Sequence, residues 1–386
     1  MKDIIPSIKS YCEAHQLLNP SNAVVLSFSA GPDSVLLFHF LAHYLTNIQH
    51  CHLIFFDHGL RDYQAEYTIL QQIESAYKLP TTIKPLAVQA HAKSTQQSIE
   101  TAARELRYQF LTEYAQQKNI TKILTAHHLD DHIETFFMQL IRGSKSKLHG
   151  ILNQTIINYP TRLIRPLLSI QKQFILDYLN HHNIAYAIDP SNDDTTHYTR
   201  NKVRHQLIPV IKEINPAYMD TITDFIQFIE GTNSVVLDQI TPYLNQIQYT
   251  SSDIHIPLEA IAPLNPFLQK TLLYHILSNQ SANHESLSHD INRICTGIDT
   301  QQSQEITLSN HEFCYIDQSG IVITPSQYQP VHYEYQVSSF PQQLTISETK
   351  QSVHFRVLSP QDDTLKSAIY HNKNPQIAYL DADKIN

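Results

Sequence analysis

The stretch that most constrains the fold is residues 23–44, where an apolar run breaks into six small or polar residues and then resumes. The first run, Ala23–Phe28, is typical of a buried strand, and the second, Ser34–Tyr44, of a buried helix. Between them stand Ser29, Ala30, Gly31, Pro32, Asp33 and Ser34. A helix that begins directly after a tight loop points free N–H groups and its positive dipole end at that loop, which favours an anion such as phosphate. An ordinary strand-to-helix turn, capped by Ser and Asp, is the alternative.

The first half of the chain alternates between strand-like and helix-like segments. We expect strands at Ala23–Phe28, His52–Phe56, Thr82–Leu86 and Lys122–Ala126, and helices at Ser34–Tyr44, Asp62–Tyr77, Thr95–Gln117 and Asp131–Arg142. This alternation predicts right-handed crossovers and an α/β fold with a Rossmann-like, doubly wound parallel sheet. Ligands of such sheets bind beyond the carboxyl ends of the strands, so the site is expected in the loops that follow them.

Three polar clusters follow predicted strands and therefore converge on that edge of the sheet. They are Ser29–Ser34, then Asp57-His58-Gly59-Leu60-Arg61, then His127-His128-Leu129-Asp130-Asp131. In the third cluster, Asp130 or Asp131 shares one helix face with Glu134. Such a pair of carboxylates can hold Mg²⁺ or bind a substrate ammonium, and the alternative is an acidic first turn that stabilises the helix dipole.

A fourth group lies within the predicted helix Thr95–Gln117. Glu100, Arg104 and Arg107 are spaced i, i+4 and i+7, so they lie on one face. An intrahelical ion pair between Glu100 and Arg104 and a role in positioning ATP are equally good explanations of this spacing.

Together these segments resemble the bacterial tRNA(Ile)-lysidine synthetases, which are PP-loop ATP pyrophosphatases. Residues 29–34 are similar to that family's Ser-Gly-Gly-x-Asp-Ser loop, with Ala30 in place of a glycine, and they lack the Lys-Ser/Thr ending of a Walker A loop. The other matching segments follow in the family's order over residues 20–212. They are His58–Arg61, Glu100–Tyr108, Ala126–Thr135, Arg142–Ser144, Ile164–Leu168, Asp189–Asn192 and Thr199–Arg204.

This resemblance implies an ATP-dependent ligation of L-lysine to C2 of the wobble cytidine of tRNA(Ile) with a CAU anticodon. The reaction would pass through an adenylated cytidine and give lysidine, AMP and pyrophosphate, with ATP and Mg²⁺ as cofactors. A PP-loop enzyme that thiolates a tRNA base, or a non-catalytic nucleotide- or RNA-binding adaptor, are the alternatives, and the resemblance leaves a homodimer open.

The resemblance also implies roles for individual residues. The catalytic residues would be Asp33, Asp130, Asp131 and Glu134, and Asp33 and Asp130 would also bind Mg²⁺. ATP would be bound by Ser29, Ala30, Gly31, Pro32, Asp33, Ser34, His58, Arg104 and His127. Lysine would be bound by Asp131, Glu134 and Arg200, and the tRNA by Arg142, Lys145, Lys147, Arg200, Asn201 and Arg204.

The net charge of −9 is unevenly distributed along the chain. Residues 142–212 contain ten Lys and Arg against four Asp and Glu, net +6, whereas residues 213–386 contain seven against nineteen, net −12. A polyanion would therefore be attracted to the middle segment and repelled by much of the C-terminal half. A solvated basic face without a partner is the alternative.

The length of 386 residues predicts two or three domains. We expect a PP-loop catalytic domain at 1–215, a mainly helical, tRNA-contacting domain at 216–327, and a small, strand-rich, mixed α/β domain at 328–386. Helices are predicted at Tyr218–Leu237, Pro266–Leu277 and His289–Thr296, and strands within 305–325 and at Val331–Val337, Leu344–Ile346 and Val353–Leu358. The final Ala378–Ile385 resembles a point ahead of that family's basic, glycine-rich stretch, so we expect little contact with an acceptor stem.

Composition excludes several other classes of protein. No run of 18 apolar residues is present, and the N-terminus leads into an amphipathic segment, so we expect a cytoplasmic protein without a membrane span or signal peptide. The four cysteines are Cys12, Cys51, Cys295 and Cys314, and they are far apart. This spacing predicts buried thiols and encodes neither a zinc site nor an iron–sulfur cluster. Base-thiolating PP-loop enzymes need reactive or cluster-binding cysteines, so the spacing also disfavours that alternative.

Overall fold

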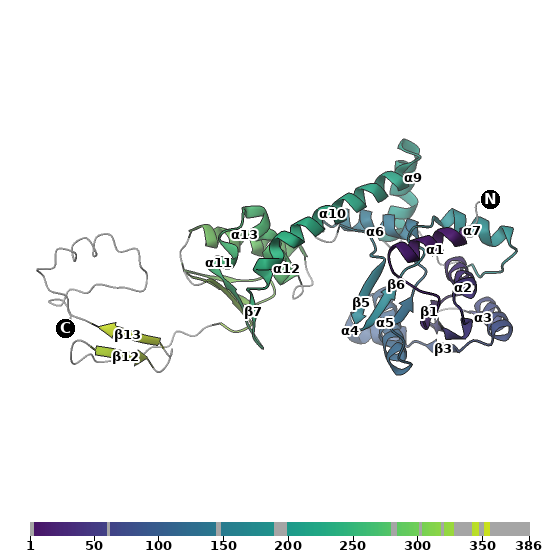
Figure 1. Ribbon diagram of the computed structural model, residues 1–386, viewed down its shortest axis with the longest axis horizontal. Coiled ribbons are helices and arrows are strands. Elements are labelled where there is room, and N and C mark those ends of the chain that lie inside the picture. Colours follow the sequence, from purple (N-terminus) through teal and green to yellow (C-terminus); the bar gives the residue numbers. More distant parts are fainter. Residues whose placement is uncertain are drawn as a thin grey trace, which may run out of the picture.

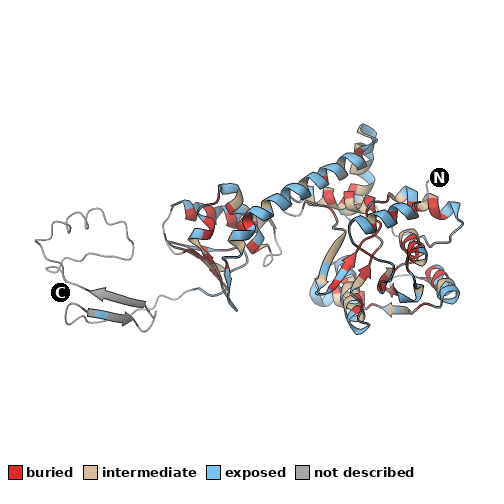
Figure 2. Cartoon of the chain, in the orientation of Figure 1, coloured by how far each residue is buried: buried red, intermediate tan, exposed pale blue. Residues whose placement is uncertain are grey.

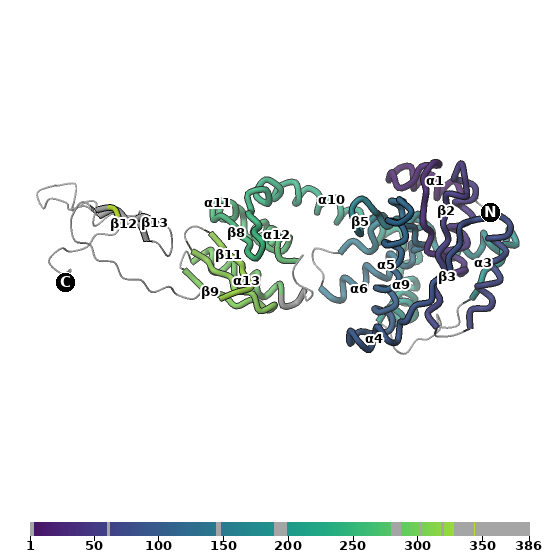
Figure 3. The backbone as a smooth tube through the Cα atoms, turned by 90° about the horizontal axis from the view of Figure 1, so that it is seen from below, coloured from purple at the N-terminus to yellow at the C-terminus, as the bar shows by residue number. Residues whose placement is uncertain are grey.

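The computed structural model describes residues 4–59, 62–143, 148–188, 199–278, 284–300, 303–317 and 320–327, and two strands at 342–346 and 351–355. An N-terminal α/β domain is joined to a smaller second domain through the long helix α10 (Tyr218–Leu244), as Figure 1 shows. The view in Figure 3, turned by 90°, shows the same succession along the long axis of the molecule.

The N-terminal domain is built on a six-stranded sheet with the order β3-β2-β1-β4-β6-β5. The strands are β1 (Val24–Phe28), β2 (Cys51–Asp57), β3 (Thr81–Pro85), β4 (Lys122–Leu124), β5 (Gln154–Asn158) and β6 (Thr161–Ile164). Neighbouring strands are parallel, except that β5 pairs antiparallel with β6. Because the strand order reverses between β1 and β4, the carboxyl ends of these two strands flank the crevice where open α/β sheets bind ligands.

Helices cover both faces of this sheet. They are α1 (Ile5–Ala14), α2 (Pro32–Tyr44), α3 (Gln64–Tyr77), α4 (Val88–Thr95), α5 (Ile99–Gln117), α6 (Leu129–Ile141) and α7 (Lys172–His181), with a short 3-10 turn at Ile48–His50. Alternate residues of β1 point to opposite faces: Leu26 packs in the core that α2 and α7 share, and Val25 packs in the core formed with α4 and α5. Figure 2 shows the buried residues in the strands and on the inward helix faces. The predicted doubly wound sheet is therefore confirmed.

The predicted strands and helices of the first half are present with ends within two residues, apart from one helix. The predicted helix Thr95–Gln117 is present as α5 but begins four residues later, because Thr95 is the last residue of α4 and α5 begins at Ile99. Gln96 has a left-handed backbone (φ 55°), and the side chain of Ser98 accepts a hydrogen bond from the Thr101 amide as the N-cap of α5. The strands β5 and β6 and the helices α1, α4 and α7 were not predicted.

Three short helical segments lead from the sheet to the second domain. These are α8 (Thr199–Lys202), a π-helix over Val203–Leu207, and α9 (Ile208–Ile214). Helix α9 contributes Ile208 and Ile211 to a small core that it shares with α6 and with Tyr218 at the start of α10. The predicted domain boundary after residue 215 falls between α9 and α10 and stays a prediction.

The second domain combines a five-stranded antiparallel sheet with helices. The strands have the order β7-β8-β11-β10-β9, with bounds Gln248–Tyr249, Ile254–Pro257, Gly320–Thr324, Phe313–Ile316 and Gln304–Thr307. The helices are α11 (Leu258–Ile261), α12 (Pro266–Leu277) and α13 (His284–Thr300). The strands expected within 305–325 are present. The expectation of a mainly helical segment missed β7 and β8, whose two and four residues are too short for a periodic signal.

Two further strands follow, β12 (Gln342–Ile346) and β13 (Gln351–Phe355), which pair as an antiparallel hairpin. They overlap two of the strands predicted in this region, and the predicted strand Val331–Val337 lies outside the described residues. Within the described parts of the chain, no helix has the length and apolar character needed to cross a membrane. All four cysteines are free and buried, as predicted.

Candidate functional site

The loop after β1 folds back on itself before α2 begins. The Ser29 amide donates to Ser34 Oγ at 3.2 Å, and the Ser34 hydroxyl donates to the Gly31 carbonyl at 3.0 Å. The Gly31 amide donates to Ser29 Oγ at 3.4 Å, and α2 starts at the next residue, Pro32. The sequence predicted this strand–loop–helix arrangement, and it places the N-terminus of α2 at the crevice between β1 and β4. Phosphate binding by the loop stays a prediction.

Ala30 adopts a backbone conformation that favours glycine. Its φ is 56°, its side chain is fully buried, and its carbonyl accepts a hydrogen bond from the Ala187 amide at 2.8 Å. A left-handed backbone costs a residue with a Cβ atom about 1–2 kcal/mol. The alanine thus makes, at that cost, a turn that a glycine would make without it.

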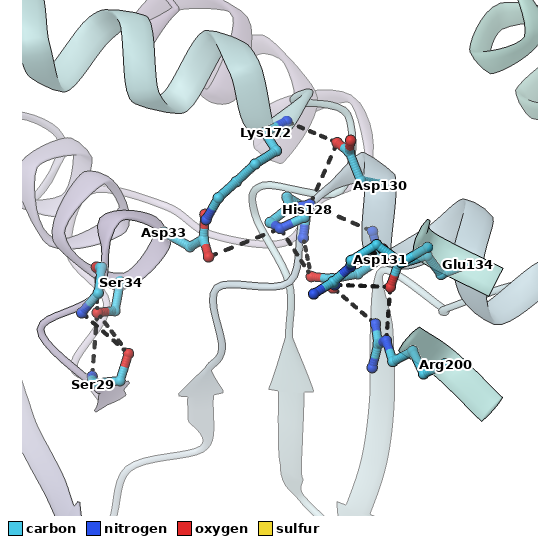
Figure 4. Close-up of polar contacts among 11 residues, drawn as sticks. Ser29, Asp33, Ser34, His128, Asp130, Asp131, Glu134, Lys172 and Arg200 are labelled. Atoms are coloured by element: carbon cyan, nitrogen blue, oxygen red, sulfur yellow. Dashed lines mark hydrogen bonds and ion pairs between the residues drawn. The ribbon is translucent and has the colours of Figure 1, made fainter. Parts of the chain in front are cut away.

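At the start of α6, His128 lies among three carboxylates. Its Nε2 is 3.4 Å from Asp131 Oδ2 and 3.9 Å from Asp33 Oδ2, and its Nδ1 is 3.6 Å from Asp130 Oδ2. The His128 amide donates to Asp131 Oδ2 at 3.1 Å, which caps the helix. Figure 4 shows these side chains gathered around the imidazole.

The carboxylates around His128 determine the charge of this group. Burial lowers the pKa of His128, but the contact with Asp130 and the charges of Asp131 and Asp33 outweigh it and raise the pKa above its ordinary value. Burial also raises the pKa of Asp130 and Asp131, and here His128 and, for Asp131, Arg200 reverse the shift, so that the pKa of both carboxyls is lowered. These shifts favour ionised carboxylates around a protonated imidazole.

Lys172 joins two of these carboxylates and was not among the predicted residues. Its Nζ is 2.6 Å from Asp33 Oδ1, and its backbone amide donates to Asp130 Oδ2 at 2.8 Å. Lys172 is the first residue of α7, whose N-cap Gln171 makes no side-chain capping bond, so Asp130 caps this helix. In the sequence, the only feature that pointed to Lys172 was its place in the basic segment 142–212.

The remaining carboxylate, Glu134, is buried and paired with two arginines. Its Oε1 accepts from Arg204 Nε at 2.6 Å, and its Oε2 accepts from Arg200 Nε at 2.8 Å and from Arg204 Nη2 at 2.9 Å. Arg200 Nη2 also donates to Asp131 Oδ1 at 2.8 Å. The structure thus brings Asp131, Glu134, Arg200 and Arg204 together, as Figure 4 shows for the first three. Binding of lysine or RNA by these groups stays a prediction.

A cationic side of the site adjoins the acidic one. Burial and the charges of Arg165, Arg200 and Arg107 outweigh Asp131 and lower the pKa of His127 to about 3, so its imidazole is neutral. Burial lowers the pKa of both Arg107 and Arg165. In the described residues, the buried Nε atoms of these two arginines have no hydrogen-bond partner. The Nη1 atom of Arg165 is already bound, since it donates to the Leu152 carbonyl at 2.6 Å and to Thr155 Oγ1 at 3.1 Å. The unpaired Nε atoms leave each arginine a donor that suits an anionic ligand.

The other predicted residues lie at various distances from this centre. His58 follows β2 at the same sheet edge, and Arg104 is exposed on α5 with its guanidinium 4.9 Å from the ring centroid of Tyr108. Arg142 is exposed at the end of α6, and Asn201 lies in α8 next to Arg200. Lys145, Lys147, Asp189 and Asn192 are outside the described residues.

The donor atoms at this edge suit a magnesium ion that arrives with a nucleotide. No three His, Cys, Asp or Glu side chains are grouped so as to hold a metal ion by themselves in the described parts of the chain. Mg²⁺ prefers oxygen ligands and usually takes only one or two protein carboxylates together with substrate phosphates. The carboxylates of Asp33 and Asp130 fit that requirement.

Comparison with known proteins adds a family and several relatives. A family model described as a PP-loop domain matches residues 6–211. The bifunctional protein TilS/HprT of Listeria monocytogenes is 29% identical over 404 residues, which cover 100% of this chain and 59% of that protein. The tRNA(Ile)-lysidine synthase of Thermosipho africanus is 33% identical over 232 residues, 59% of this chain and 53% of the relative.

A third relative also matches more of the chain than the PP-loop family model does. The tRNA(Ile)-lysidine synthase of Nitrosomonas europaea is 29% identical over 289 residues, which cover 72% of this chain and 60% of the relative. The chain thus spans less than two thirds of the length of each of these three proteins.

Proposed function

The chain belongs to the PP-loop domain family, and from this membership we propose that it uses ATP to ligate L-lysine to C2 of the wobble cytidine of tRNA(Ile) with a CAU anticodon. The observation that carries the proposal is the meeting of Asp33, from the loop after β1, with the acidic start of α6 around one imidazole. Relatives that carry the name tRNA(Ile)-lysidine synthase support the choice of substrate.

The proposed reaction has two steps. In the first, O2 of the cytidine attacks the α-phosphorus of ATP, the bond from that phosphorus to the bridging oxygen breaks, and pyrophosphate leaves. In the second, the neutral ε-amine of lysine attacks C2, the C2–O bond breaks, and AMP leaves with the loss of one proton. Preorganised donors and Mg²⁺ stabilise the charge that develops when pyrophosphate leaves.

The two sides of the site suit the two charged substrates. The N-terminus of α2, the half-buried Arg107 and the buried Arg165 would hold phosphate groups. Asp131 would face the ammonium of lysine, and Arg200 would pair with the carboxylate of the free amino acid. Because both oxygens of Glu134 already accept from guanidinium groups, we assign Glu134 the role of positioning Arg200 and Arg204.

The RNA would approach over the exposed cations near α6 and α9. Arg142, Lys202 and Lys212 are exposed there, and they would contact backbone phosphates. The wobble base is in a single-stranded loop and would have to turn into the crevice for its C2 to be reached, at a cost of a few kcal/mol.

The four cysteines argue against a base thiolase. Burial raises the pKa of Cys12, Cys51 and Cys314 to about 12, and burial also raises the pKa of Cys295. The thiolate is the reactive form of cysteine, so these thiols are suited to packing and not to sulfur transfer.

The test is to incubate the protein with ATP, radiolabelled lysine and a transcript of the CAU-anticodon isoleucine tRNA. We expect label in the RNA and one AMP for each lysine incorporated, with little label from arginine or ornithine. Asp131→Ala should abolish incorporation, and Asp238→Ala, on the exposed side of α10, is the matched control. AMP formation without label in RNA would reject the ligation, and a fully active Asp131→Ala would reject the site.

A further inference from the structure

We propose that Lys172 is an exchangeable cation of the phosphate site: Asp33 holds its ammonium in the free protein, and the pyrophosphate part of bound ATP takes it over. The inference rests on the proposed use of ATP and adds a residue outside the segments that resemble known motifs. Its basis is the ion pair between Lys172 Nζ and Asp33 Oδ1, whose atoms are 2.6 Å apart.

The ion pair is open to a ligand. The side chains of Lys172 and Asp33 are 32% and 27% exposed, so neither group is sealed inside the core. Asp33 lies in the first turn of α2, directly after the loop that would hold phosphate. A phosphate group at that helix end would therefore come within reach of the Lys172 ammonium.

The backbone of Lys172 is fixed while its ammonium can move. Its amide donates to Asp130 at 2.8 Å, and Ile175 and Leu179 of α7 are buried in the same core as Leu36 and Leu37 of α2. The lysine side chain is a flexible four-carbon stem that ends in a point charge. The ammonium can thus change partners without any movement of α7.

The charge of Asp33 explains why the Lys172 ammonium would pair first with this carboxylate and then with phosphate. A carboxylate beside a phosphate-binding loop repels the anion unless a cation compensates for it. In the free protein Lys172 compensates for Asp33 at Oδ1, and His128 Nε2 lies 3.9 Å from Oδ2. When the nucleotide brings Mg²⁺ to Asp33, the ammonium is released, and lysine commonly contacts phosphates as a point charge.

A purely structural role is the competing explanation. In that case the Lys172–Asp33 pair only ties α7 to α2, and replacing Lys172 would lower the melting temperature without changing anion affinity. The two explanations differ in ligand binding, so the test measures both properties on the same variants.

The experiment measures binding of inorganic pyrophosphate to the full chain by titration calorimetry, with Mg²⁺ and with EDTA. We expect Lys172→Met to weaken binding in Mg²⁺ about tenfold to a hundredfold, since a hydrogen bond to a charged group contributes about 1.5–3 kcal/mol. Lys172→Arg should retain most of the affinity. Lys9→Met removes an exposed lysine that pairs with Glu13 on α1 and is the matched control, which should bind as the wild type does.

A second comparison tests the exchange itself. In EDTA, Asp33→Asn should bind pyrophosphate more tightly than the wild type, because Lys172 is released and the repelling charge is removed. If the exchange is real, Lys172→Met in the Asp33→Asn background should remove most of that gain. A gain that persists in full in the double variant would show repulsion by Asp33 alone and would overturn the proposal.

Two further results would also overturn it: wild-type protein that binds no pyrophosphate, and a folded Lys172→Met that binds it within about twofold of wild type. Pyrophosphate binding requires neither lysine nor RNA. A failure of lysidine formation would therefore reject the proposed function and leave this measurement intact, and the reverse also holds.

Discussion

Glu134 provides the sharpest test of how the site is held together. The residue is 2% exposed, and its two carboxylate oxygens accept three hydrogen bonds from Arg200 and Arg204. These arginines belong to α8 and the π-helix, so the carboxylate fixes this segment to α6. Removing the carboxylate should loosen that attachment and destabilise the N-terminal domain.

The magnitude follows from burial on each side of the contact. Removing one partner of a buried ion pair costs about 3–5 kcal/mol. Here the Arg200 and Arg204 side chains are 30% and 33% exposed, and Asp131 still accepts from Arg200. Water and Asp131 therefore recover part of the loss, and we expect about 2–3 kcal/mol for Glu134→Ala. Glu134→Gln keeps one acceptor oxygen and should cost about 1–2 kcal/mol.

The assay is thermal unfolding followed by far-UV circular dichroism, because the chain has no tryptophan. For a domain of about 200 residues, each kcal/mol lowers the melting temperature by about 2–4 °C, so Glu134→Ala should lower it by about 4–12 °C. Glu259→Ala, an exposed glutamate on α11, is the control and should melt with the wild type. A Glu134→Ala transition within 1 °C of wild type, roughly a quarter of the smallest expected shift, would refute the reasoning.

Two other predictions concern pH and RNA. The pKa of His127 is lowered to about 3 in the folded protein. In the unfolded chain this histidine binds a proton near its ordinary pKa of about 6.5, and in the folded protein it does not. The free energy of unfolding therefore falls as the pH drops from about 6.5 toward 3. Urea unfolding at several pH values in this range should show that His127→Asn removes this part of the pH dependence; an unchanged slope would contradict the assignment. Residues 213–386 carry a net charge of −12, so truncating the tRNA to its anticodon stem-loop should weaken binding less than about tenfold in filter assays. A loss of several hundred-fold would show that the acidic half binds the rest of the tRNA.

The sheet and the phosphate loop could be predicted because their signals are local. The run Val24–Phe28 is apolar throughout, as expected for a strand buried on both faces, and the loop that follows has a distinctive composition. The edge strand β5 was missed because it is only partly buried along its length and its residues do not form a continuous apolar run. The break between α4 and α5 depends on Gln96, a residue with no marked preference for a left-handed backbone.

The site was predicted only in part because its contacts join residues far apart in the chain. Glu134 and Arg200 were both predicted to bind lysine, but they were not predicted to pair with each other, since they are 66 positions apart in the chain. Lys172 is 139 positions from Asp33, and no motif marks it. Spacing along a helix predicts which side chains share a face, but it carries no information about the partner that a second helix brings to that face.

These pairings change the meaning of the basic middle segment. Its net charge of +6 predicts a surface for RNA, but three of its ten cations, Lys172, Arg200 and Arg204, pair with carboxylates of the site, and Arg165 is buried. The acidic groups come from α2 and α6, and the paired cations come from α7, α8 and the π-helix. The segment therefore completes the charge balance of the site with one part of its positive charge, and six cations remain for phosphates. If all six contact the tRNA, the logarithm of affinity falls with the logarithm of salt concentration with a slope no steeper than about −5.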